Sequence, residues 1–429
     1  MDPVSNTTPR VSIRRKANII ALVLCVLGLG LVGWLVWREA GASSHWSAAN
    51  EALAAGDIDT ARKELAHCLE AWPDDAEVHF LAARTARRDR EYGDAEKLLA
   101  RAEGLGWVRE AVSLEQALLK VQRAGRMLGY EEYFVKCIDG GHPDAILILE
   151  AIVPVLYSNF HLNQADRLSR VWTDKAPGSF DAWFFRGRVL ERRASVRGAS
   201  ECFAEAVKLR PDHIEARLGL GRTLLESNQP TPALEVYNAL RAREPLNREI
   251  LLGLAGCYRT LGRTKEARST LDDLLARHPE DGRVLTERAR VETIAGDHPA
   301  AEKWFREALE HPPFPPRFWL FFAITLAQND KPEEAAKIRK RHEQAEADLA
   351  LLEQVCDRIA AEPADLGARV TAGEILLRNH HEAAGLGWID SALVIEPRYA
   401  PAHKALADYF EERNPERAEM HRRLAGSTE

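Results

Sequence analysis

The fold of this chain is decided by the stretch FDAWFFRGRVLERRASVRGASECFAEAVKLRPDH (residues 180–213) and by its successor IEARLGLGRTLLESNQPTPALEVYNALRAREPLN (residues 214–247). Both stretches are 34 residues long, and residues of the same type recur at this spacing on either side of them. Prolines recur at Pro143, Pro177, Pro211, Pro245, Pro279 and Pro313. Alanines recur at Ala165, Ala199, Ala233, Ala267, Ala301 and Ala335. Chance does not repeat one spacing this often, so the period is structural.

Each 34-residue unit contains two runs of apolar residues at helical spacing, separated by turn residues such as Gly262 and Arg263. The periodic proline closes the second run. Small residues occupy the first run where two helices must approach closely, at Gly187, Gly221, Ala255 and Ala289. Bulky residues occupy the second run, at Phe203, Tyr237, Leu271 and Phe305. Each unit is therefore predicted to form a helical hairpin.

This arrangement resembles the tetratricopeptide repeat pattern, W-x2-L-G-x2-Y followed by A-x3-F and P. The unit 180–213 carries it at Trp183, Gly187, Leu190, Ala199, Phe203, Ala206 and Pro211. The resemblance implies an all-α fold, a right-handed α-solenoid of about ten to eleven helix-turn-helix units. The predicted order is two repeats at 42–109, a degenerate repeat at 110–145, five regular repeats at 146–315, a repeat with an extended helix at 316–365, and C-terminal repeats with a polar cap at 366–429.

A different pattern precedes the repeats. Residues 18–37 read NIIALVLCVLGLGLVGWLVW, an apolar run long enough to span the ~30 Å hydrocarbon layer of a bilayer. Basic residues crowd its N-terminal side within residues 1–17, which predicts a cytoplasmic tail. We therefore expect a signal anchor of a single-pass membrane protein, with the repeats on the outer, periplasmic side. A cleaved signal peptide ending near Ala40 to Ala42 is the alternative, and a lipoprotein is disfavoured because Leu24 precedes Cys25.

Composition excludes several functions. A net charge of −7 over 429 residues argues against general nucleic-acid binding. The six cysteines lie far apart with no C-x-x-C pair, and we interpret them as core residues. His342-Glu343 and His380-His381-Glu382 lack the further ligands that a zinc site needs. The sequence carries no phosphate-binding loop or nucleophile motif, so we expect no enzyme activity, no cofactor and no metal.

The resemblance also implies a binding surface. In the family, the second, fifth, ninth and twelfth residues of each unit line a concave groove that receives a peptide or a helix. Arginine and aromatic residues at these positions are the predicted groove residues: Phe80, Arg84, Arg87, Phe184, Arg188, Arg222, Arg259 and Arg290. We expect a basic groove that prefers acidic or C-terminal peptide segments. The alternative is that these arginines pair with neighbouring glutamates such as Glu191, Glu215 and Glu249. The asparagines of the family's carboxylate clamp are missing here.

The sequence thus favours a membrane-anchored scaffold that binds other proteins. One anchor followed by repeats resembles bacterial envelope assembly factors, although the paired C-x-x-C motifs of some of them are absent. Two alternatives stay open. The chain could be a noncatalytic subunit of an envelope enzyme or polysaccharide-export complex, or a structural protein that self-associates into homo-oligomers.

Overall fold

The computed structural model describes residues 40–312, 314, 317–362 and 364–426. The predicted membrane segment 18–37 and the periodic Pro313 lie outside these ranges. Across the described ranges, no helix combines the length and the apolar character needed to cross a membrane.

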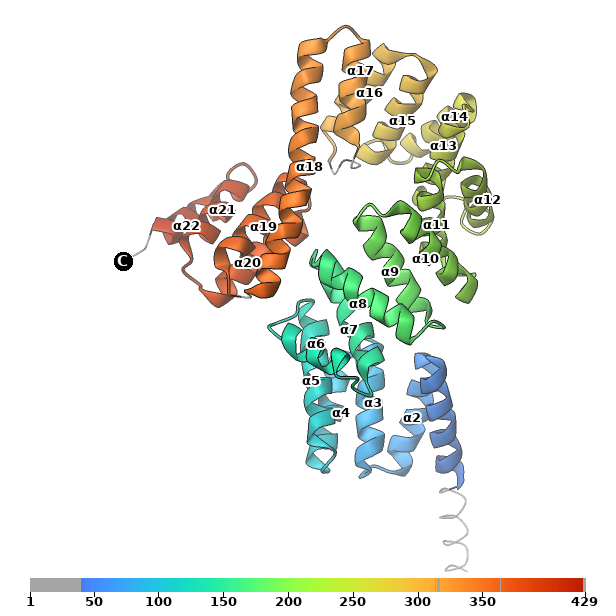
Figure 1. Cartoon of the computed structure of the whole chain (residues 1–429), viewed down its shortest axis with the longest axis vertical. Coiled ribbons are helices and arrows are strands. Elements are labelled where there is room, and N and C mark those ends of the chain that lie inside the picture. The colour runs from blue at the N-terminus through green and yellow to red at the C-terminus, as the bar shows by residue number, and fades with distance from the viewer. Residues whose placement is uncertain (1–39, 313, 315–316, 363, 427–429) are drawn as a thin grey trace, which may run out of the picture. The chain divides into compact units, whose positions relative to one another are not determined.

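Helices follow one another in pairs throughout the described part of the chain, which contains no strand (Figure 1). A helix at 40–55 and α2 (Ile58–Ala71) form the first of ten pairs, and α3 (Ala76–Arg88) with α4 (Tyr92–Gly104) form the second. The helices α5 (Arg109–Ala124) and α6 (Glu131–Asp139) follow in the chain and belong to different compact units. The next three pairs are α7 (Ala145–Ser158) with α8 (Leu162–Lys175), α9 (Phe180–Arg192) with α10 (Val196–Leu209), and α11 (Ile214–Glu226) with α12 (Pro230–Arg241). The last five are α13 (Arg248–Thr260) with α14 (Thr264–Leu275), α15 (Gly282–Ala295) with α16 (His298–Leu309), α17 (Phe318–Gln328) with α18 (Pro332–Ala361), α19 (Leu366–Arg378) with α20 (Glu382–Ile395), and α21 (Ala400–Phe410) with α22 (Pro415–Gly426). The predicted all-α repeat fold is confirmed.

The turn inside every pair except α21–α22 has a residue with left-handed backbone. Gly262 and Gly296 take φ values of 73° and 80°, and the equivalent Ala194 and Asn228, at the same 34-residue spacing, take 55° and 56°. Glycine adopts this conformation without the steric cost that a Cβ atom brings. These hairpins therefore place one left-handed residue in the turn, but that residue need not be glycine.

Aromatic residues of the second helices are enclosed by glycines of two consecutive first helices. Tyr237 on α12 packs between Gly221 on α11 and Gly253 on α13, and it is 1% exposed. A Cβ atom built on Gly253 would lie 2.2 Å from the Tyr237 ring, far inside van der Waals contact. Each such ring therefore joins its own hairpin to the next one, which is how the stack buries a continuous core.

Gly253→Ala is expected to lower the free energy of unfolding by about 2 kcal/mol. Overpacking against Tyr237 destabilises by up to about 3 kcal/mol, and the higher helix propensity of alanine offsets about 1 kcal/mol of this loss. The matched control is Gly256→Ala on the same helix. A Cβ atom there meets the flexible end of Leu225 at 2.8 Å, so this change should be neutral or stabilising. Urea unfolding followed by circular dichroism compares the two, and equal stability of both variants would contradict the packing argument.

The structure divides into two compact units, one ending at Ala124 and the other beginning at Gly125. In unit 1, a buried carboxylate on α5 holds two arginines of α3. Glu115 accepts hydrogen bonds from Arg84 Nε and Arg87 Nε, both at 2.6 Å, and Arg87 also donates to Gln122 at 2.7 Å. Glu115 and Arg87 are each 2% exposed. This ionic cluster is the polar centre of the unit 1 core.

In unit 2, α18 changes the period of the array. The left-handed turn residue of the α17–α18 pair is Asp330 and that of the α19–α20 pair is His380, a separation of 50 residues in place of 34. The surplus lies in α18, which runs for 30 residues without a break (Figure 1). Sixteen extra residues extend a helix by about 24 Å and about 4.4 turns. The repeats after α18 are therefore shifted by sixteen residues from the 34-residue register.

The C-terminal repeats contact the beginning of unit 2. Phe160, in the turn between α7 and α8, is buried in an apolar cluster with Leu352, Val355, Cys356 and Ile359 of α18 and with residues of α19 and α20. His161 lies 5.5 Å from the Trp388 ring, centroid to centroid. Asn163 Nδ2 donates to Asp357 Oδ2 at 2.5 Å across a sequence separation of 194 residues. We call this junction the closing contact.

Candidate protein-binding site

The first helices of three consecutive repeats in unit 2 share a hollow of about 170 Å³. Helices α11, α13 and α15 line it. Its apolar lining comes from Leu218, Leu225, Leu252, Gly253, Gly256 and Tyr237, and its charged lining from Arg222, Arg259, Arg283, Arg290, Glu249 and Glu287. Apolar surface ringed by charged groups is the composition expected of a site for a peptide segment.

Glycines form the hollow because they leave space on α13 where other residues would place a side chain. Gly253 is required by Tyr237, as described above. Gly256 faces Leu225 of α11 on one side, and the Glu287 carboxylate of α15 lies 3.7 Å from a Cβ atom built on it. The same small-residue packing that stacks the hairpins thus leaves a depression between leucines of α11 and α13.

One carboxylate at the hollow serves two arginines. Glu287 accepts from Arg259 Nε at 2.6 Å and from Arg290 Nη1 at 2.7 Å. Burial alone would raise the pKa of Glu287, but the positive charges of Arg290 and Arg259 outweigh burial and lower the pKa below its ordinary value. Burial lowers the pKa of Arg290 although Glu287 opposes this, and repulsion from Arg259 adds to the lowering. This part of the site carries more positive than negative charge.

The other two arginines of the hollow are paired one to one. Arg222 donates from Nε and Nη2 to the two oxygens of Glu191, at 2.8 and 3.0 Å. Arg283 donates from Nη1 and Nη2 to the two oxygens of Glu249, both at 2.7 Å. In each pair, two N–H donors of the guanidinium group bond both oxygens of one carboxylate, so these donors are occupied. For Arg222, the alternative of pairing with a neighbouring glutamate describes the structure.

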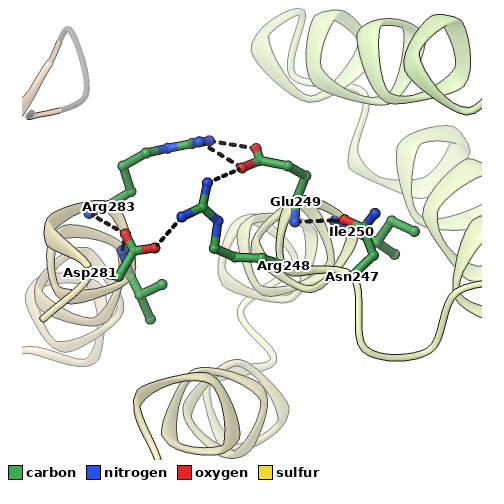
Figure 2. Close-up of polar contacts among 7 residues, drawn as sticks. Asn247, Arg248, Glu249, Ile250, Asp281 and Arg283 are labelled. Carbon is green, nitrogen blue, oxygen red and sulfur yellow. Dashed lines mark hydrogen bonds and ion pairs between the residues drawn. The ribbon is translucent and has the colours of Figure 1, made fainter. Parts of the chain in front are cut away.

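The Glu249 pair belongs to a network that fixes the N-terminal ends of α13 and α15 (Figure 2). Asn247 and Asp281 cap these helices, each accepting from two backbone N–H groups. Arg248 donates to Asp281 at 2.8 Å and to Glu249 at 3.1 Å, which connects the two caps. The N-terminal ends of α13 and α15, which line this end of the hollow, are therefore fixed relative to each other.

Two other predicted groove residues of unit 2 lie on α9 and do not line the hollow. Phe184 is 8% exposed and packs among Phe180, Phe203 and His213. Arg188 donates to the Tyr157 hydroxyl at 3.2 Å, and its guanidinium lies 4.7 Å from the centre of the Tyr157 ring. Both residues contribute to the packing of α9 on α7 and on the following repeat.

The three predicted residues of unit 1 form part of its core. Phe80 is 4% exposed and stacks on Trp107 at 5.4 Å between ring centres. Arg87 is 2% exposed, and Arg84 is held by Glu115. Trp107 stacks on Phe80, and Glu115 of the next first helix holds Arg87, which accounts for the burial of these two side chains. Their groove role stays a prediction.

Sequence reasoning missed the apolar half of the hollow. Leu218 and Leu252 stand at the fifth position of their 34-residue repeats, and Gly256 stands at the ninth position. The fifth and ninth positions are groove positions in the family pattern. The prediction from the sequence takes arginine and aromatic residues as binding anchors and leaves leucine and glycine aside. The repeat register predicts that these three residues face the groove. It does not predict the depth of the hollow, which the two glycines create between the leucines.

The described cysteines are all free, and most are buried. Burial raises the pKa of Cys202 to about 11 and the pKa of Cys257 to about 12, so both thiols stay protonated at neutral pH. Cys25 lies outside the described ranges. Among described residues, no group of three or more His, Cys, Asp or Glu side chains is placed as metal ligands would be.

Stacked helical hairpins with a shared hollow on their first helices define a helical repeat protein. The tetratricopeptide repeat family model matches residues 47–109, 195–247 and 233–291. These parts of the chain are tetratricopeptide repeats, and the repeat resemblance inferred from the sequence is confirmed. Proteins that carry such repeats mediate contacts between proteins.

Several solved structures are similar to this chain. PilW, described as a widely conserved type IV pilus biogenesis factor, is 18% identical, with 46% of this chain and 91% of that chain covered and a TM-score of 0.38. A tetratricopeptide repeat protein from Parabacteroides merdae is 14% identical, with 67% and 99% covered and a TM-score of 0.37. A thermophilic repeat protein from Thermus thermophilus is 24% identical, with 46% and 100% covered and a TM-score of 0.34. No curated protein matches the chain.

Proposed function

We propose that this protein is a scaffold that binds a segment of another protein on the face formed by α11, α13 and α15. The observation that carries the proposal is the hollow on these three helices, which leucines, glycines and arginines line together. Apolar surface supplies binding energy when it is covered, and charged groups at its edge select the partner. The proposed role is noncatalytic.

The proposal extends to location. The apolar run 18–37 would anchor the chain as a signal anchor in a membrane, with the N-terminus in the cytoplasm and the repeats on the outer side, as the basic residues before it predict. A scaffold held there would act in the assembly of an envelope complex. Chemical labelling of exposed lysines with a reagent that does not cross membranes tests which side the repeats occupy. On the outer side, the repeats should be labelled as strongly in intact cells as in lysed cells.

A photo-crosslinking experiment tests the binding face. The photoreactive residue p-benzoylphenylalanine replaces Leu252, inside the hollow, or Val394, an exposed residue at the end of α20. We expect light-dependent adducts with a defined protein from position 252 and none of the same mass from position 394. Adducts from position 252 should disappear when Gly256 is changed to leucine, which fills the hollow. Identical adducts from both positions would argue against a binding role for this face.

A further inference from the structure

We propose that the hollow on α11, α13 and α15 binds a peptide segment in which an aliphatic side chain of about the size of leucine is accompanied by a carboxylate. This inference rests on the proposed function and names the chemistry of the partner. It separates the hollow into an apolar part and an anion-binding part, each provided by different residues.

The hollow as a whole has room for about one side chain. A volume of about 170 Å³ corresponds to roughly six water molecules at the ~30 Å³ that each occupies in the liquid. Water there would face Leu218, Leu225 and Leu252, which offer it no hydrogen bonds. Replacing that water with a branched aliphatic side chain is favourable, because it removes apolar surface from solvent on both partners. Among the described residues that line the hollow, Tyr237 is the one aromatic side chain.

The anion-binding part consists of Arg259 and Arg290. These two guanidinium groups share the single carboxylate of Glu287, so one positive charge is left over. Arg290 stacks on the Phe321 ring at 4.4 Å, and its Nε is buried without a hydrogen-bond partner among the described residues. A buried donor without an acceptor costs free energy, and a charged acceptor would relieve that cost. Glu226 and Arg317 carry opposite charges and both interact electrostatically with Arg290, and burial raises the pKa of Glu226.

Charge balance identifies the incoming group as a carboxylate and not a cation. Four arginines and two glutamates line the hollow, a surplus of two positive charges. Glu191, which lies outside the lining, neutralises Arg222, and Glu249 neutralises Arg283. One surplus positive charge therefore remains at Arg259 and Arg290, which share Glu287. A lysine in the ligand would meet repulsion there, whereas an aspartate or glutamate beside the aliphatic residue would accept from both guanidinium groups.

The test uses the full-length protein and a defined set of peptides with blocked termini. Each peptide carries one leucine and one glutamate separated by zero to three serines. Matched peptides replace the glutamate with glutamine or lysine, or the leucine with alanine. Binding is measured for the wild type, for Arg290→Gln, and for Arg243→Gln as the control, since Arg243 is exposed and pairs with Asp212 away from the hollow. Leu252→Ala enlarges the apolar part without introducing a new contact.

We expect at least tenfold tighter binding of one leucine–glutamate spacing than of its glutamine or alanine counterpart. Arg290→Gln should reduce the preference for glutamate to less than threefold and keep the preference for leucine, and Leu252→Ala should do the reverse. Arg243→Gln should behave as the wild type. Binding without a glutamate preference, a preference unchanged in Arg290→Gln, or no binding of any peptide would overturn this inference. The crosslinking from position 252 decides the proposed function separately, because it requires no particular ligand chemistry.

Discussion

Glu115→Gln is expected to lower the free energy of unfolding of unit 1 by about 3–5 kcal/mol, the usual cost of removing one partner from a buried ion pair. The substitution keeps the shape of the side chain and removes its charge. Arg87, which is 2% exposed, would then be a buried cation without a counter-ion, and an amide N–H₂ group would face guanidinium donors. Urea unfolding measures the loss, and hydrogen exchange in α3 and α5 locates it. The control is Glu96→Gln, an exposed partner of Arg123, which should cost less than about 0.5 kcal/mol.

The same residue makes unit 1 sensitive to acid. Burial would raise the pKa of Glu115, but Arg87 and Arg84 outweigh it and lower the pKa below the ordinary value of 4.5. A carboxylate whose pKa is lowered by folding contributes its full stability above the pKa of the unfolded state, and this stability is lost as the pH falls through the folded pKa. The wild type should therefore lose stability below about pH 4.5, while Glu115→Gln should lack this contribution at every pH. An equal acid response in both proteins would contradict the assignment.

Phe160→Gly is expected to destabilise unit 2 by about 2–4 kcal/mol. Deleting a buried phenylalanine side chain destabilises a protein by about 3–5 kcal/mol. Glycine removes the steric cost of a Cβ atom in the left-handed backbone, at a φ of 63°, which offsets about 1 kcal/mol of the loss. Phe160 occupies the turn position that glycine fills in the hairpins of Gly262 and Gly296. A phenylalanine at this position carries a backbone cost, which its burial against α18 offsets.

Ala194→Gly at the equivalent turn provides the matched control. Ala194 has a φ of 55° and is exposed, so glycine should stabilise the protein by about 0.5–1 kcal/mol. Urea unfolding measures the change in the free energy of unfolding for each substitution. A loss of stability in Phe160→Gly together with a gain in Ala194→Gly would establish that the closing contact forms in solution. Hydrogen exchange of residues 350–362 should rise in Phe160→Gly. Stabilisation by both substitutions would show that the contact contributes nothing.

The repeat architecture could be predicted from the sequence because it depends on local order. Proline, alanine and glycine at a 34-residue spacing specify where each helix begins, ends and approaches its neighbour. These features act within one hairpin or between adjacent hairpins, so a register read along the chain captures them. The pairing of Tyr237 with Gly221 follows from the family pattern, whereas its contact with Gly253 required the stacking of the next repeat.

The candidate site was predicted in part. Arg222, Arg259 and Arg290 were selected from their register positions, and all three line the hollow. Their partners depend on which side chains face one another across repeats, and residues 28 to 31 positions apart decide that. Phe80 and Arg87 occupy corresponding positions in unit 1 but are buried, because Glu115 and Trp107 cover them. Position in the repeat predicts the direction of a side chain and leaves its exposure open.

The sequence by itself determined the helical hairpins, their order and the positions at which they pack, because the 34-residue period encodes contacts between neighbours. Only the tertiary structure decided the closing contact, the assignment of ion pairs and the depth of the hollow. The ion pairs and the hollow depend on how neighbouring repeats stack, and the closing contact depends on the long helix α18, which carries part of that contact. Phe160 and Leu352 meet across nearly two hundred residues, and no local pattern records such a distance.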